Sequence, residues 1–269
     1  MRLLLLTQDF PPDVGGIQTY CAELARRFAA SCDAFAVMAP RVAGDEEVDA
    51  ALPYPVHRVT ATSNTLPFRA IRPLRRLLRE GDFDVVLHAQ WQTLPASVAA
   101  RRRGFKGRIV LAAHGRELLL APLSSLGPAQ RVYDAFRRRM VHHVDLVLPV
   151  SRYTGGLVAE LGIPTDRMVV VSNGTDPEHF RPLDVSDLRQ ELGLTGVPVL
   201  LSVGRLTPRK GFDTVIEALP SIRRQVPEAV YVLVGGGEDR ERLEALARTH
   251  GVADAVRFVG KVAYADLPR

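Results

Sequence analysis

The chain has 269 residues, of which 46% are hydrophobic and 24% are charged. This composition can supply a hydrophobic core and excludes an intrinsically disordered chain, and the length suits two domains of ordinary size. The longest apolar runs are strand-sized, so we expect no transmembrane helix, and the two cysteines lack the spacing of metal ligands, which fits a reduced cytoplasmic setting.

The net charge of +5 is unevenly distributed along the chain. Residues 51–150 contain 16 Lys and Arg against 6 Asp and Glu, a local excess of +10. Such a segment can contact an anionic membrane or an acidic substrate, or it can form solvated helix faces. No nucleic-acid-binding motif accompanies the charge, so we expect no nucleic-acid partner.

Short apolar runs alternate with helix-length amphipathic segments along the whole chain. The runs predict strands at 2–7, 34–39, 84–88, 108–113, 145–150, 168–172, 199–203, 229–234 and 256–259, with one further short strand within 40–66. The amphipathic segments predict helices near 16–31, 67–80, 92–103, 128–143, 151–162, 184–193, 211–226 and 238–250. This alternation indicates the α/β class, with doubly wound parallel sheets whose strands are covered on both faces.

Two prolines, Pro177 and Pro182, interrupt the alternation and mark the predicted domain boundary. The first domain is predicted to span 1–180 and the second 181–269. Because the second contains only three predicted strands, we expect it to be an incomplete copy of a doubly wound domain.

The loop after the first predicted strand contains two prolines and then Gly15 and Gly16, where a helix begins. Glycines at a helix start let a ligand approach the backbone, and ligands of open α/β sheets bind beyond the carboxyl ends of the strands. The motif G-x-G-x-x-G is missing, so a dinucleotide fingerprint is not present. The alternative is a tight turn without a ligand.

Two histidines close predicted strands at the same edge of the sheet. His114, followed by Gly115, is the first candidate for this crevice, and His88 is the second. The alternative for each is a hydrogen-bonded structural side chain. His142 and His143 end a basic helix, where imidazole suits the helix dipole, and we interpret both as structural.

A second strand-to-helix corner, at 203–211, contains Arg205 and Lys210 between two glycines. A helix N-terminus presents unpaired N–H groups, a guanidinium group offers a planar fork for phosphate oxygens, and a lysine adds a point charge. The corner therefore predicts a diphosphate site, with a solvated charged turn as the alternative.

Six motifs follow one another in register over nearly the whole chain. They are 11–18, His114-Gly115, 172–176 with Phe180 and Pro182, 203–205 with 210–211, 234–237, and 256–260. Together they resemble glycosyltransferase family 4, also called the group 1 glycosyltransferases. The resemblance implies the GT-B fold, in which two Rossmann-like domains hold a nucleotide-sugar donor and an acceptor. It also implies a retaining transfer without a metal and without a cofactor beyond the UDP- or GDP-linked donor.

The resemblance assigns roles to four residues of the reaction site. Arg205 and Lys210 match the pair that neutralises the donor diphosphate, and Gly16 matches the loop glycine that also approaches the donor. His114 matches the active-site histidine that hydrogen-bonds the transferred sugar.

The resemblance also points to four residues at the margins of the site. Gly15 and Gln18 belong to the loop on the acceptor side. Lys261 and Val262 fall where the family's backbone touches the nucleobase. The family's later motif, two glutamates separated by seven residues, has no counterpart before the end of the chain at Arg269. We therefore expect this form to lack part of its donor site.

The expected function is transfer of a hexose from a nucleotide-sugar to a lipid-linked or polysaccharide acceptor of the cell envelope. The Gly15–Gln18 segment is similar to that of mannosyltransferases that act on phosphoinositide lipids. We expect a cytoplasmic protein, in peripheral contact with an anionic membrane if the basic segment binds lipid. The alternatives are a truncated, non-catalytic binding module, and an epimerase or hydrolase of sugar nucleotides, which would need a carboxylate pair.

Overall fold

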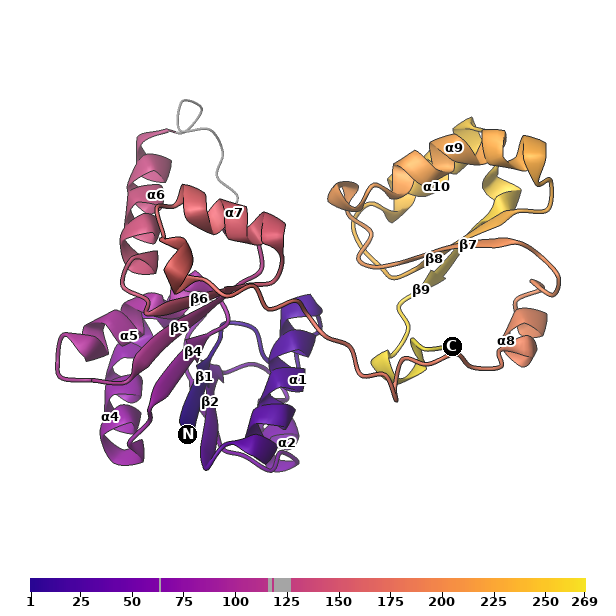
Figure 1. Cartoon of the computed structure of the whole chain (residues 1–269). Coiled ribbons are helices and arrows are strands. Elements are labelled where there is room, and N and C mark those ends of the chain that lie inside the picture. Colours follow the sequence, from indigo (N-terminus) through magenta and orange to yellow (C-terminus); the bar gives the residue numbers. More distant parts are fainter. Residues whose placement is uncertain (63, 116–117, 119–126) are drawn as a thin grey trace. The chain divides into compact units, whose positions relative to one another are not determined.

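The structure is a computed structural model that describes residues 1–62, 64–115, 118 and 127–269. The chain forms two compact units, Met1–Gly174 and Thr175–Arg269 (Figure 1). The predicted boundary between residues 180 and 181 falls a few residues later in the chain. Each unit contains its own parallel sheet, as the α/β prediction requires.

The first sheet has the strand order β3-β2-β1-β4-β5-β6, and all its pairings are parallel. This is the order of a doubly wound dinucleotide-type fold, in which strands are added on one side of β1 up to β3 and on its other side from β4 onward. The strands are β1 Arg2–Leu6, β2 Ala34–Pro40, β3 Val56–Val59, β4 Val85–His88, β5 Arg108–Ala113 and β6 Leu146–Pro149.

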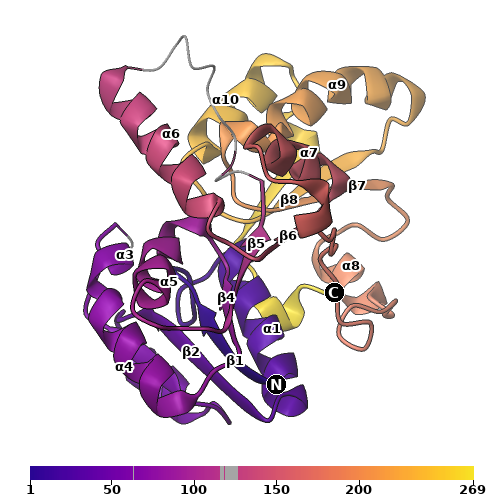
Figure 2. The ribbon, with the colours of Figure 1, turned by 60° about the vertical axis from the view of Figure 1, so that its left-hand side comes forward.

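Helices cover both faces of this sheet, with α1 on one face and α4 and α5 on the other (Figures 1 and 2). Side chains of β1 alternate between two cores: Leu3 and Leu5 pack with α1, while Leu4 and Leu6 pack with α4 and α5. The helices are α1 Gly16–Ser31, α2 Asp45–Ala50, α3 Leu66–Arg69, α4 Ile71–Gly81, α5 Leu94–Arg101, α6 Pro128–Val141 and α7 Arg152–Glu160.

The structure differs from the predicted helices in two places: one predicted helix is divided in two, and one observed helix was not predicted. The segment predicted as one helix at 67–80 forms two helices, α3 and α4. Pro73 has no N–H that could donate to the carbonyl of Arg69, so the helical hydrogen-bond pattern is interrupted there. Helix α2 lies in the stretch expected to be a loop with one short strand; that strand is β3.

The predicted strand at 168–172 is wrong. Only an isolated bridge joins Val147 to Met168, although the N–H of Val169 donates to Val147 O over 3.0 Å and that of Val171 to Pro149 O over 2.9 Å. A parallel ladder also needs an N–H from the partner strand, and Pro149 has none to give. The segment therefore runs beside β6 without becoming a strand.

The second sheet has the order β7-β8-β9, again with parallel pairing. Helices α9 and α10 lie on the same face of it (Figure 1) and share a core with Leu200, Tyr231 and Leu233. The elements are β7 Val199–Val203, β8 Val230–Val234, β9 Val256–Gly260, α8 Ser186–Glu191, α9 Phe212–Gln225 and α10 Arg240–Thr249.

Within the described chain, no helix packs on the other face of this sheet, and its edges are exposed although the central Val232 is only 4% exposed. Leu201 is 61% exposed and Val203 54% exposed, and Val259 is also exposed. The expectation that every strand is covered on both faces is therefore met by the first unit and not by the second.

Candidate functional site

The first unit gathers three loops at the carboxyl ends of β1, β4 and β5. The loop after β1 leads to Gly15 and Gly16, the segment after β4 begins at Ala89, and His114 follows β5 directly. Since β1 and β4 are neighbours where the strand order reverses, this edge is the usual ligand site of such a sheet.

A hydrogen-bonded set of side chains fixes the loop after β1. Gln18 Nε2 donates to Asp9 Oδ1 over 2.8 Å, and Gln90 Nε2 donates to the other carboxylate oxygen. Gln90 Oε1 accepts from the backbone N–H of Gln8 over 3.1 Å and from the Thr7 hydroxyl over 3.2 Å. The loop is thereby tied both to α1 and to the segment after β4.

His114 lies beside this set of side chains. Its ring meets that of Tyr20 edge to face, with centroids 4.6 Å apart. Burial and then the charge of Asp13 raise the pKa of Asp9, and the nearby His114 opposes this shift only in part. Burial also raises the pKa of Tyr20 to about 12, so this phenol stays neutral. The structure thus brings His114 to the start of α1, where Gly15, Gly16 and Gln18 lie.

Gly16 faces open space among the described residues: a Cβ built on it would meet none of their atoms within 4 Å. At Gly15, by contrast, a built Cβ would lie 2.4 Å from Oε1 of Gln18, the side chain that bonds Asp9. A side chain at Gly15 would therefore displace Gln18. The backbone at the start of α1 remains accessible to a ligand.

His88, the second histidine candidate, is a structural residue. It is completely buried, with Nδ1 2.6 Å from Thr93 Oγ1 and Nε2 2.9 Å from Ser97 Oγ. Burial lowers its pKa to about 3. The ring therefore stays neutral and joins β4 to α5. His142 also has a structural partner, because its Nε2 lies 3.0 Å from Leu161 O.

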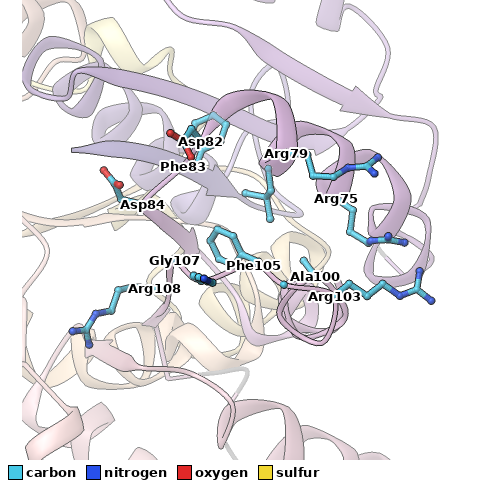
Figure 3. Close-up of a pocket in the computed structure, with 13 residues that line it drawn as sticks. Arg75, Arg79, Asp82, Phe83, Asp84, Ala100, Arg103, Phe105, Gly107 and Arg108 are labelled. Carbon is cyan, nitrogen blue, oxygen red and sulfur yellow. The ribbon is translucent and has the colours of Figure 1, made fainter.

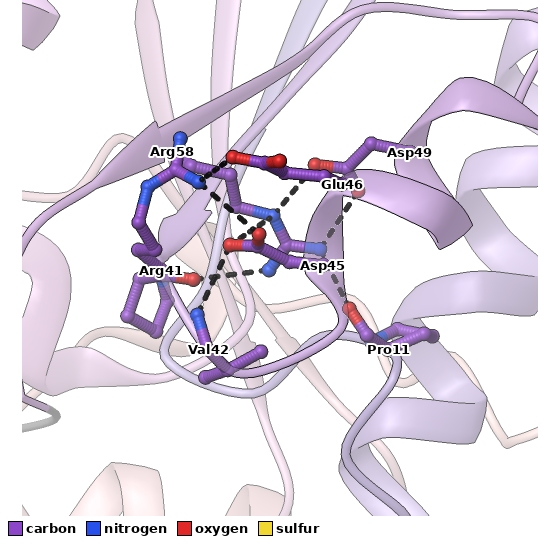
Figure 4. Close-up of polar contacts among 8 residues, drawn as sticks. Pro11, Arg41, Val42, Asp45, Glu46, Asp49 and Arg58 are labelled. Atoms are coloured by element: carbon purple, nitrogen blue, oxygen red, sulfur yellow. Dashed lines mark hydrogen bonds and ion pairs between the residues drawn. The ribbon is translucent and has the colours of Figure 1, made fainter.

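A buried arginine holds the proline segment of the loop after β1 (Figure 4). The guanidinium group of Arg58, on β3, donates to Pro11 O over 2.6 Å and pairs with Asp49 over 2.8 Å. It also lies 5.5 Å from the centre of the Phe10 ring and 3.7 Å from a carboxylate oxygen of Asp45. Ion pairs and ring contacts from β3 and α2 thus position the segment that precedes the two glycines.

Sequence reasoning missed Asp9, Gln90 and Arg58. Asp9 and Gln90 follow buried strands by a few residues, a pattern that the sequence contains. Arg58 had no such signal in the sequence. It lies on β3 and its acidic partners lie on α2, in a stretch that was expected to be a loop with one short strand.

In the second unit, glycines bring the ends of β7 and β8 into contact. A Cβ on Gly235, whose φ is +136°, would lie 1.9 Å from Gly204 O, and one on Gly237 would lie 2.1 Å from Leu206 O. Backbone bonds join the same segments, from Gly204 N to Val234 O and from Leu206 N to Gly236 O. Only glycine allows this close approach.

We call the close contact made by Gly204, Gly235, Gly236 and Gly237 the glycine platform. Three cations lie next to it, and all three are exposed. Arg205 follows β7, Lys210 precedes α9, and Lys261 follows β9. A built Cβ on Gly204 would meet Lys210 Cε at 3.8 Å, and one on Gly236 would meet Lys261 Cε at 3.3 Å. Within the described chain, the side chains of Arg205 and Lys210 have no hydrogen-bond or ion-pair partner. Val262 lies next to Lys261, partly buried.

Gly211 turns the chain into α9 with a left-handed φ of +67°. The first N–H groups of this helix therefore lie directly after Lys210. A helix start, a guanidinium group and an ammonium group at one edge of a sheet form a suitable environment for a diphosphate.

The described residues contain neither a membrane-spanning helix nor a metal-ligand cluster. No helix among them is both long enough and apolar enough to cross a bilayer. Nor do three or more of their His, Cys, Asp and Glu side chains form a group that could hold a metal ion.

Two family models match the chain in succession. The model of Glycosyltransferase Family 4 matches residues 14–179, and that of Glycosyl transferases group 1 matches residues 184–269. The first match covers more than half of the chain.

Related sequences are found among curated bacterial enzymes. A GDP-mannose-dependent alpha-(1-6)-phosphatidylinositol monomannoside mannosyltransferase of Mycobacterium tuberculosis is 36% identical, over 99% of this chain and 69% of its own. A D-inositol 3-phosphate glycosyltransferase of Acidothermus cellulolyticus is 30% identical, over 91% of this chain and 61% of its own.

Solved structures share the fold. HepE of Anabaena, in complex with UDP, matches with a TM-score of 0.79 at 21% identity, over 100% of this chain and 71% of its own. Sucrose-phosphate synthase of Thermosynechococcus elongatus matches with a TM-score of 0.77 at 18% identity, over 100% of this chain and 72% of its own.

Proposed function

Because the chain belongs to glycosyltransferase family 4 and has the GT-B fold, we propose that it transfers a hexose from a nucleotide-sugar to a glycolipid or polysaccharide acceptor. The observation that carries this proposal is the pair Arg205 and Lys210 on the glycine platform of the second unit. Both side chains are exposed and unpaired within the described chain, at the start of α9.

The chemistry of this corner suits a departing nucleoside diphosphate. When the bond between the sugar and the diphosphate breaks, negative charge develops on the leaving oxygen. Arg205 can hold two phosphate oxygens at once, and Lys210 can add a point charge. The first N–H groups of α9 add the positive end of the helix dipole. The pair would thus supply the charge neutralisation that other transferases obtain from a metal ion, with retention of the anomeric configuration as the family implies.

The first unit would hold the sugar and the acceptor. His114 would hydrogen-bond the transferred sugar, while Gly16 would present the start of α1 to the donor. Gly15 and Gln18 would shape the acceptor side, since Gln18 is held by Asp9. Lys261 and Val262 would contact the nucleobase from the end of β9.

A mannosyl donor is favoured over other hexoses. The mannosyltransferase of Mycobacterium tuberculosis, matched over 99% of this chain, is named as GDP-mannose-dependent and as acting on phosphatidylinositol monomannoside. We therefore propose GDP-mannose as the donor and a phosphoinositide glycolipid as the acceptor. A polysaccharide precursor is the competing acceptor class.

The test combines nucleotide binding with sugar transfer. Purified wild type, Arg205→Ala and Lys210→Ala are titrated with GDP and UDP, and each is assayed with GDP-mannose and phosphatidylinositol monomannoside. Loss of a charge-assisted contact should weaken GDP binding about tenfold or more and lower transfer at least as much. Arg209→Ala, an exposed neighbour in the same turn, is the matched control and should retain binding.

Three outcomes would contradict the proposal. Near-normal binding and turnover in Arg205→Ala or Lys210→Ala would exclude the diphosphate assignment. Hydrolysis or epimerisation of the nucleotide-sugar without transfer to any acceptor would favour a different enzyme class, and nucleotide binding without any turnover would favour a non-catalytic binding module.

A further inference from the structure

The first unit has a basic pocket at the edge of its sheet opposite to the candidate site. The pocket has a volume of about 540 Å³ and is lined by α4, the turn after α5 and the residues that precede β4 and β5 (Figure 3). His114 follows the other end of β5. A strand of six residues is about 20 Å long, so the pocket is separate from the edge where His114 lies.

Positive charge dominates the lining of this pocket. Five of its residues are basic, and two, Asp82 and Asp84, are acidic. Figure 3 shows the guanidinium groups of Arg75, Arg79 and Arg103 at the same end of the pocket, away from both carboxylates. Asp84 is already engaged, because its Oδ2 accepts from the N–H of Arg2 over 2.7 Å. Among the described residues that line the pocket, no carboxylate therefore lies at the end formed by the three arginines.

These three guanidinium groups have no hydrogen-bond or ion-pair partner among the described residues. They are also close enough to repel one another. The pKa of Arg75 is lowered, chiefly by desolvation and in addition by the positive charges of Arg103 and Arg79. Like charges one helical turn apart, as at Arg75 and Arg79, destabilise a helix slightly. The negative end of the α4 dipole compensates Arg79, which lies in the last turn, but Arg75 lies one turn further from it.

The floor of the pocket is apolar. Phe105 lies between the basic end and the opposite end, and Leu78, Phe83 and Ala100 also line the cavity (Figure 3). A site that joins planar cations to an apolar floor suits a ligand with a phosphate group and an apolar portion. Bulk surface charge alone would not require such a cavity.

We propose that this pocket binds the phosphate group of an anionic ligand, with Arg75, Arg79 and Arg103 as its direct partners. The phosphate comes either from the headgroup of an anionic lipid or from a free phosphate compound. Binding here does not depend on the proposed transfer reaction, because none of the three arginines lies at the carboxyl ends of the strands.

The experiment compares two triple variants of the chain. One carries Arg75→Gln, Arg79→Gln and Arg103→Gln. The control carries Arg72→Gln, Arg102→Gln and Arg139→Gln, which remove the same charge from exposed positions outside the pocket. Both are built on Arg205→Ala/Lys210→Ala, which removes the two cations of the proposed diphosphate site. Thermal unfolding confirms that each variant is folded.

Two probes distinguish the two sources of phosphate. Inorganic pyrophosphate is titrated by calorimetry, and co-sedimentation is measured with vesicles of equal parts phosphatidylcholine and phosphatidylglycerol. The pocket variant should lose about tenfold or more in affinity for at least one probe, whereas the control should change about twofold at most. Loss for pyrophosphate supports a free phosphate ligand, and loss for vesicles alone supports a lipid headgroup. Equal losses in both variants, or no binding by the parent protein, would overturn the proposal.

Discussion

The two sheets of this chain contain similar apolar strands that differ in how many of their faces are buried. In β1, Leu3 to Leu6 are buried on both faces, because α1 covers one face and α4 with α5 the other. In β7, Leu200 packs on the helices, but Leu201 and Val203 remain exposed. Both segments consist almost entirely of apolar residues. An apolar run therefore predicts a strand without revealing how many of its faces are covered.

The two candidate half-sites differ in a related way. In the first unit, side chains from several elements hold one another, as Asp9, Gln18 and Gln90 do. In the second unit, glycine backbones pack together and the cations above them are left exposed. The first half-site is thus built from side-chain hydrogen bonds and the second from backbone contact.

The largest expected effect tests the difference between the two sheets. Leu5→Ala removes a side chain that is 0% exposed and should lower the free energy of unfolding by about 3 kcal/mol. Leu201→Ala changes a side chain that is 61% exposed and should alter it by less than about 0.5 kcal/mol. Denaturant unfolding followed by far-ultraviolet circular dichroism measures both. A large loss in Leu201→Ala would mean that this face is covered in solution.

A smaller effect tests the backbone contact of the second half-site. Gly235→Ala forces a Cβ against Gly204 O and should cost about 2 kcal/mol of stability, with a marked loss of GDP binding. Gly236→Ala is the matched control, because a Cβ there meets only the flexible side chain of Lys261, at 3.3 Å. Unfolding by denaturant and titration with GDP measure the two variants. If both behaved alike, the close approach of the two strand ends would not determine the site.

The smallest effect concerns pH and the buried interior of the first unit. The pKa of His88 is lowered to about 3, so the unfolded chain takes up a proton near pH 6.5 while the folded chain does not. The free energy of unfolding should therefore decrease as the pH is lowered, by about 1 kcal/mol between pH 6.5 and pH 5.5 from His88 alone. In His88→Gln this contribution disappears, so the stability gap to wild type should narrow on acidification.

The fluorescence of Trp91 measures that gap, because this single tryptophan is 2% exposed and belongs to a core of the first unit. A gap that stayed constant with pH would show that the ring of His88 can be protonated in the folded state.

Much of the fold could be predicted from local patterns in the chain. The predicted strand at 108–113 has the observed bounds of β5, and the motif residues His114, Arg205 and Lys210 lie at the carboxyl edges where the alternation of strands and helices placed them. These features depend on residues close together in sequence. Local periodicity is sufficient to locate them.

The features that escaped prediction depend on contacts between distant segments. Asp9 and Gln90 are 81 residues apart and meet only because β1 and β4 are neighbours in the sheet. Arg58 reaches Pro11 across 47 residues, and the basic pocket joins α4 to the turn after α5. Strand order determines such contacts, and a single sequence does not reveal strand order.

Pro149 has a consequence for how the protein behaves at high concentration. It interrupts the backbone ladder to the segment 169–171, which runs beside the last strand of the first sheet and whose three valines, Val169, Val170 and Val171, are 51%, 45% and 50% exposed. Three consecutive β-branched residues with incompletely used backbone groups can serve as a template for strand pairing between molecules. We expect self-association of this protein to begin at these valines, and a lysine in place of Val170 to raise its solubility.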